Sequence, residues 1–98
     1  MTTRNRPPTH PGSLLRDDLE TIGIPIRQAA QEMGISRQML HRILAEKAPV
    51  TAEMALRIGK FLGNGPGLWL RMQAAYDLWH AEQALAADLA HIPTHKAA

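Results

Sequence analysis

The sequence predicts an all-α fold of five helices in one small domain. Alanine, leucine, methionine, glutamine, arginine and glutamate are abundant, whereas aromatic residues make up 4% of the 98 residues. This composition favours helices over strands. Apolar residues, 45% of the chain, recur at intervals of three and four. Glycines and prolines separate these periodic segments, most clearly at Gly63-Asn64-Gly65-Pro66-Gly67.

The length and charge restrict the functions that are open to the chain. Ninety-eight residues suit a single modest core. There is no cysteine for a disulfide or a thiolate metal site. No apolar run is long enough to span a bilayer and the first residues lack an apolar signal region, which predicts a soluble cytoplasmic protein. A formal net charge of +2 does not by itself indicate nucleic acid.

The first helix is predicted to begin at Pro11 and to end at Gly23, because proline fits a first helical turn. Its inward face should carry Leu15, Leu19 and Ile22. Residues 1–9 show no periodicity and contain two arginines, so we expect a flexible arm. Such an arm either follows a DNA backbone or stays disordered.

The centre of the chain has two short amphipathic segments on either side of Gly34. The second helix is predicted from Pro25 or Ile26 to Met33, and the third from Ser36 or Arg37 to Glu46. A tight corner between two helices needs a residue that tolerates a left-handed backbone, which glycine does. Ala30 allows the two helices to approach closely, and the apolar seam behind them comprises Met33, Ile35, Leu40, Ile43 and Leu44. This spacing is typical of a helix-turn-helix.

The outward face of the third helix carries long hydrogen-bond donors, together with Ala45. Arginine suits guanine and glutamine suits adenine in the major groove. The candidate base-reading residues are Arg37, Gln38, His41 and Arg42. Two alternatives stay open: an ordinary solvated charged face, and a helical scaffold in which the corner serves only packing.

Contacts to phosphate are expected around this helix. They should come from the first turn of the second helix, from the N-cap residues of the third and fourth helices, and from the loop after the third helix. The candidates are Arg27, Gln28, Ser36, Lys47 and Thr51. Pro25 stands where many such units have a serine or threonine cap, and this removes one phosphate contact. Thr51 is equally well explained as a purely structural cap of the fourth helix.

The fourth helix should follow Thr51 and end near Leu62, and the fifth should run from Leu68 to about Ala90. The fifth helix has two apolar stripes, and one small domain can cover only one of them. A second exposed stripe would be a large patch for a monomer, so we expect homodimerisation. The candidate dimer residues are Trp69, Met72, Tyr76 and Trp79. Which stripe pairs stays open, as does a wide core that covers both.

Residues 10–90 therefore form the predicted domain and residues 91–98 a flexible tail. His91 and His95 have the spacing of metal ligands on a helix, but Pro93 lies between them. His10 and His80 look isolated. We find no phosphate-binding loop, nucleophile elbow or paired acid in a catalytic context, so we expect no enzyme activity, cofactor or metal.

Taken together, these motifs resemble the HigA-type antitoxins, a branch of the lambda-repressor-like (XRE) helix-turn-helix proteins. The resemblance covers about residues 10–80. It is carried by HPGSLLRDDL, AAQEMGISRQMLHRIL, VTAEMALRIGKFLGNGPGLWL and QAAYDL. The central motif indicates only the broad class, whereas the HPG start combined with GPGLWLRMQAAYDL is much more specific.

The resemblance implies a five-helix lambda-repressor-like DNA-binding domain with a long C-terminal helix. It implies a homodimer that binds a near-palindromic operator and represses its own operon, on the nucleoid when bound to DNA. It also implies neutralisation of a HigB-like toxin, an mRNA endonuclease. Related proteins act as regulators without a toxin, and that alternative stays open.

Overall fold

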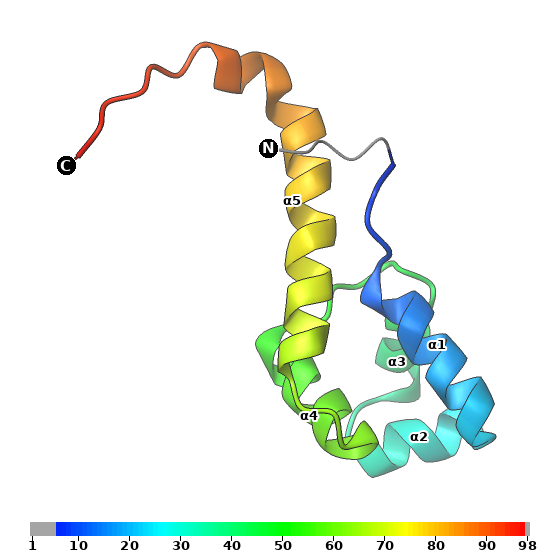
Figure 1. The fold of residues 1–98 in the computed structure, drawn as a ribbon. Coiled ribbons are helices and arrows are strands. Elements are labelled where there is room, and N and C mark those ends of the chain that lie inside the picture. Colours follow the sequence, from blue (N-terminus) through cyan, green and yellow to red (C-terminus); the bar gives the residue numbers. More distant parts are fainter. Residues whose placement is uncertain (1–5, 98) are drawn as a thin grey trace.

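In the computed structural model, which describes residues 6–97, the chain forms five helices and those residues contain no strand (Figure 1). The helices are α1 (Pro11–Ile22), α2 (Ile26–Met33), α3 (Arg37–Leu44), α4 (Ala52–Leu62) and α5 (Gly67–Ala90). The predicted all-α fold is confirmed. Most of the predicted N-terminal arm, residues 1–5, and the last residue of the tail lie outside the described residues. Residues 6–9 and 93–97 form neither helix nor strand.

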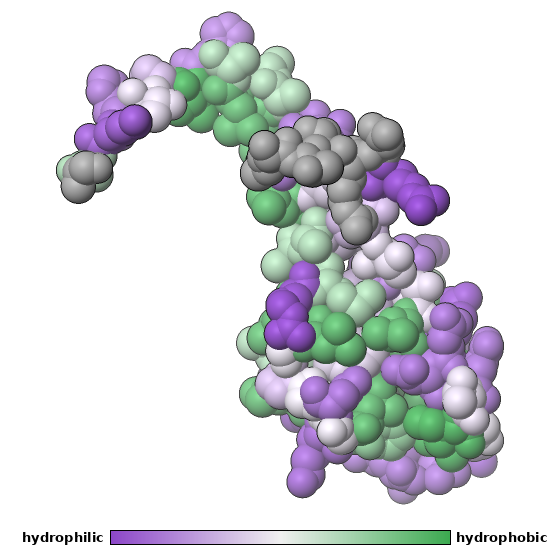
Figure 2. Space-filling view, viewed as in Figure 1, coloured by the Kyte–Doolittle hydropathy of each residue, from purple (hydrophilic) through white to green (hydrophobic). Residues whose placement is uncertain are grey.

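The molecule consists of a body and one projecting helix, with overall dimensions of 50 × 28 × 23 Å. Helices α1 to α4 pack together beside the first part of α5, with α4 and α1 in contact with it, and the rest of α5 extends away from them (Figure 1). Every residue from His80 to Ala97 is exposed. Figure 2 shows apolar residues on this projecting part, far from the body.

The core lies where α1, α2, α3, α4 and the start of α5 meet. Its largest fully buried side chains are Trp69, Leu15, Leu40, Ile43 and Ile58. The seam expected behind the helix-turn-helix is largely confirmed, since Met33, Leu40, Ile43 and Leu44 are buried and Ile35 packs against them. Ala30 is 2% exposed, as its close contact with the next helix requires.

Two details of α1 differ from the sequence-based expectation. His10 is the N-cap residue, and its Nδ1 accepts a hydrogen bond from the Gly12 amide at 2.9 Å. Ile22, expected to face inward, is 50% exposed. It lies in the last turn of α1, directly before the Gly23 cap, and is not part of the buried cluster.

Trp69 corrects the predicted dimer surface. Its side chain is 0% exposed within one protomer, and its Nε1 donates to Asn64 Oδ1 at 3.1 Å. A fully buried indole offers no surface to a second chain, so its place in the proposed dimer interface was wrong. The stripe that begins at Trp69 instead joins α5 to the body: Gln73 is buried, and Met72, Tyr76 and Trp79 are half-buried.

Candidate nucleic-acid interface

The corner between α2 and α3 is built as the sequence predicts. Gly34 has φ 72°, in the left-handed region, and its amide donates to the Gln31 carbonyl at 3.2 Å. The Ile35 amide donates to the Ala30 carbonyl at 3.0 Å. These two bonds form a Schellman turn, which satisfies carbonyls at the end of α2. Pro25 occupies the N-cap position of α2 and supplies no side-chain hydrogen bond, also as expected.

Helix α3 presents its polar side chains to solvent. Ser36 caps its N-terminus, with the Oγ accepting from the Met39 amide at 3.0 Å. The four predicted base-reading residues, Arg37, Gln38, His41 and Arg42, are all exposed, as is Ala45. The opposite face is buried through Leu40, Ile43 and Leu44. An exposed row of donors on a rigidly packed helix is the geometry that base recognition in a major groove requires.

The C-terminal end of α3 comes two residues earlier than predicted, at Leu44 instead of Glu46. The reason is a second Schellman turn. Glu46 has φ 62°, the only positive φ of a non-glycine residue in the described chain. Its amide donates to the Ile43 carbonyl at 3.0 Å, and the Lys47 amide donates to the Arg42 carbonyl at 2.8 Å. The left-handed residue reverses the chain direction and ends the helix.

The predicted phosphate-contacting residues are all exposed, but some of their side chains already make hydrogen bonds within the protein. Arg27 and Lys47 reach solvent. Gln28 Nε2 donates to Glu32 Oε2 at 2.7 Å. Thr51 caps α4, with its Oγ1 accepting from the Met54 amide at 3.3 Å, so the structural role left open for it is present.

Sequence reasoning missed a buried polar pair that supports the loop after α3. Gln73 is 6% exposed, and its Oε1 accepts from the Val50 amide at 2.7 Å while its Nε2 donates to Asp77 Oδ1 at 2.9 Å. His10 is 3% exposed and its ring meets that of Tyr76 edge-on at 4.8 Å. The only signal for this histidine was its position before Pro11, where a helix cap is needed.

Burial lowers the pKa of His10 below its ordinary value. Loss of solvation of the charged ring is the main cause, and the negative charges of Glu46 and Asp77 and the backbone of Ala48 oppose it. The neutral ring is the form that fits this place, because Nδ1 accepts the Gly12 hydrogen bond and is therefore unprotonated.

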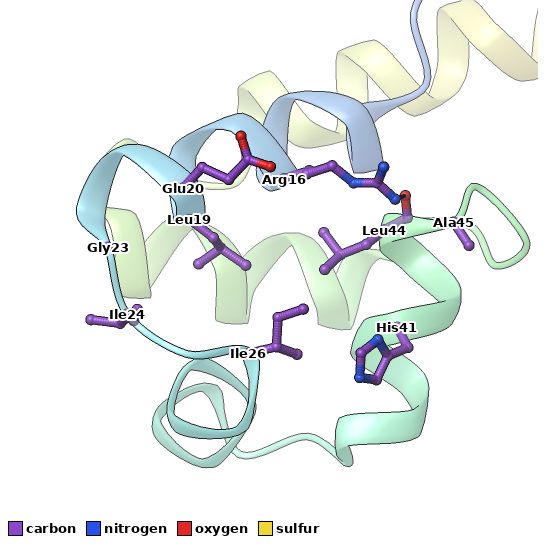
Figure 3. Close-up of a pocket in the computed structure, with 9 residues that line it drawn as sticks. All are labelled: Arg16, Leu19, Glu20, Gly23, Ile24, Ile26, His41, Leu44 and Ala45. Atoms are coloured by element: carbon purple, nitrogen blue, oxygen red, sulfur yellow. Dashed lines mark hydrogen bonds between the residues drawn. The ribbon is translucent and has the colours of Figure 1, made fainter.

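A cleft of about 560 Å³ opens between α1, the start of α2 and α3. Figure 3 shows its apolar side chains, Leu19, Ile24, Ile26 and Leu44, with Arg16, Glu20 and His41 also lining it. The cleft therefore adjoins one of the candidate base-reading residues. Within residues 6–97, no three His, Asp or Glu side chains gather in a way that could hold a metal ion. None of the helices there is long and apolar enough to cross a membrane.

Comparison with known proteins agrees with this geometry. A helix-turn-helix family model matches residues 15–70. Virulence-associated protein A' of Dichelobacter nodosus is 40% identical over 76 residues, which are 76% of this chain and 66% of that protein. Antitoxin HigA-1 of Vibrio cholerae is 34% identical over 80 residues, covering 81% of this chain and 75% of the relative.

Two solved structures that contain DNA have the same fold. The antitoxin GraA in complex with its operator superposes with a TM-score of 0.85 at 30% identity, covering all of both chains. Pseudomonas aeruginosa antitoxin HigA with the higBA promoter gives a TM-score of 0.82 at 28% identity, covering 89% of this chain and 96% of the other.

Proposed function

Because the chain belongs to the helix-turn-helix family of the XRE type and is related to HigA antitoxins, we propose that it is an operator-binding repressor and antitoxin. It acts as a homodimer, represses its own operon and neutralises a HigB-like toxin. The DNA-binding part of this proposal rests mainly on α3, whose four long polar side chains are exposed while its other face is anchored in the core. The likeness to operator-bound GraA along the whole chain supports the same role.

In this mechanism α3 enters the major groove, and Arg37, Gln38, His41 and Arg42 read base edges. Arg27, Gln28, Ser36, Lys47 and Thr51 contact phosphates and fix the register of the protein on the duplex. Two copies of α3 should lie about 34–36 Å apart, one turn of the duplex, so that the operator is a near-palindrome.

Substitution of Gln38 by alanine tests base reading. A cognate duplex is first selected by the wild-type protein from a random library. On that duplex the variant should lose about 1–3 kcal/mol of binding free energy, whereas binding to unselected DNA should change little. Gln83→Ala, an exposed glutamine on the projecting helix, is the matched control. An equal loss on both duplexes would count against base reading by Gln38.

We assign the homodimer interface to the second apolar stripe of α5, because the stripe that begins at Trp69 is part of the core. Leu78 and Leu85 are 61% and 45% exposed, and Leu89 and Ile92 continue the row at 47% and 62%. Leu78, Leu85 and Leu89 are seven and four residues apart, which keeps them on one side of α5, and Ile92 follows just after the helix ends. An apolar row of this length along a projecting helix suits pairing with an identical helix.

Leu78→Glu tests this pairing because it places a charge on the stripe. We expect a monomer in sedimentation experiments and weaker operator binding, because two half-sites are no longer held together. Leu56→Glu is the matched control, since Leu56 on α4 is also 61% exposed but lies off the stripe. A dimer that persists in Leu78→Glu would exclude this surface.

The antitoxin role rests on the relationship to HigA-1. Its test is co-expression with the small basic protein expected from the adjacent reading frame, followed by co-purification and a growth assay. Formation of a complex and rescue of growth would support neutralisation. An adjacent product that is neither bound nor toxic would favour the alternative, a free-standing XRE-family regulator.

A further inference from the structure

Two arginines from other helices hold the backbone around α3, one at its C-terminal end and one at the corner between α2 and α3. At the C-terminal end, loop amides satisfy the carbonyls of His41, Arg42 and Ile43. The carbonyl of Leu44 is left, and Arg16 Nη2 of α1 donates to it at 2.7 Å. A guanidinium at this point also meets the negative end of the helix dipole.

At the opposite end, an arginine of α4 reaches the corner before α3. Arg57 Nη1 donates to the Met33 carbonyl at 3.0 Å and to the Gly34 carbonyl at 3.3 Å. Its Nε donates to Glu53 Oε2 at 3.2 Å, which fixes the direction of the guanidinium. A Cβ on Gly34 would lie 2.7 Å from Arg57 Nη1, so a larger residue here would push the guanidinium out of its present position.

We propose that Arg16 and Arg57 are positioning residues for DNA recognition, which fix the orientation of α3 by clamping the backbone at its C-terminal end and at the corner between α2 and α3. Hydrogen bonds from charged donors are stronger and more directional than neutral ones. Within residues 6–97 these arginines are the side chains that donate to the carbonyls of Met33, Gly34 and Leu44. Base reading needs this rigidity, because a bidentate contact to a base edge depends on placement of the side chain to a fraction of an ångström.

Each arginine could instead contact a phosphate directly, and the two roles predict different salt dependence. Loss of a phosphate contact weakens binding to every duplex and lowers the slope of log affinity against log salt by about 0.9. Loss of a positioning residue weakens binding to the cognate duplex only. It leaves that slope unchanged, because the number of neutralised phosphates stays the same.

The inference rests on the DNA-binding role proposed above, so the experiment has one readout with DNA and one without. Arg16→Met and Arg57→Met are compared with Arg71→Met, which removes the same charge from an exposed position on α5. Affinity for the selected duplex and for unselected DNA is measured across a salt series. Hydrogen exchange of the α3 amides, relative to those of α1, is measured without DNA.

We expect each clamp variant to lose roughly tenfold or more in cognate affinity, comparable to one impaired base contact. Binding to unselected DNA and the salt slope should match Arg71→Met, and exchange should accelerate selectively in α3. A lowered salt slope with equal loss on both duplexes would overturn the proposal in favour of phosphate contacts. Unchanged cognate affinity would also overturn it.

Two further outcomes separate the clamp from the proposed function. If the wild-type protein selects no duplex at all, the DNA-binding proposal fails, and the exchange data alone report whether the arginines hold α3. If Arg57→Met unfolds, Arg16→Met decides the question, because Arg16 is exposed and its replacement leaves the buried core unchanged. Uniform exchange in both helices of Arg16→Met would refute the clamp.

Discussion

Replacement of Glu46 by glycine should stabilise the protein. Glu46 has φ 62°, and its left-handed conformation is imposed by the two hydrogen bonds of the turn after α3. A residue with a Cβ loses about 1–2 kcal/mol in this region. Glycine avoids that cost but loses about 0.5–1 kcal/mol more conformational entropy on folding. The difference leaves a net gain of about 0.5–1 kcal/mol in the free energy of unfolding.

The measurement is urea unfolding followed by circular dichroism, supported by thermal melts. A gain of this size should raise Tm by about 2–8 °C in a domain of this length. Glu46→Ala is the control, because it removes the carboxylate and keeps the Cβ in the left-handed region. The alanine variant should show no gain. Equal stability of the glycine and alanine variants would show that the backbone at residue 46 carries no strain, and the reasoning would fail.

Two substitutions and one change of pH test the buried contacts near α3. Gly12→Ala should destabilise the protein by about 1–3 kcal/mol in urea unfolding, because an added Cβ would overlap the Ile43 carbonyl. Gln73→Met should cost about 1–3 kcal/mol in the same assay, because it leaves the buried amide of Val50 without an acceptor. Stability should be greatest above pH of about 6.5 and should decline below it, since the unfolded chain then binds a proton more readily than buried His10 does. His10→Asn, which keeps a capping oxygen, should flatten that decline in urea titrations at several pH values.

Much of the fold could be predicted from local patterns. The period of the apolar residues placed all five helices, and Gly34, Ser36 and Thr51 behave as the corner and caps that their chemistry suggests. The resemblance to HigA-type proteins is confirmed by the comparisons. These features depend on neighbours within a few residues in the chain, which is the range over which a sequence pattern is informative.

The groups that fix the site depend on contacts between distant residues, and these escaped prediction. Arg57 reaches the corner carbonyls across 24 and 23 positions, and Arg16 reaches Leu44 across 28. Nothing in the sequence distinguishes these arginines from those on an ordinary solvated surface. The end of α3 was misplaced for a related reason, because glutamate rarely adopts the left-handed conformation that ends it here.

The sequence by itself determined which segments are helical, where the polar corner lies and that one long helix carries more apolar surface than a small domain can cover. Only the tertiary structure decided how that surface is divided, with Trp69 inside one protomer and the row through Leu78 outside. Both stripes are apolar at helical spacing, so composition cannot rank them. The choice follows from the angle at which α5 leaves the body, and that angle is a property of packing between helices.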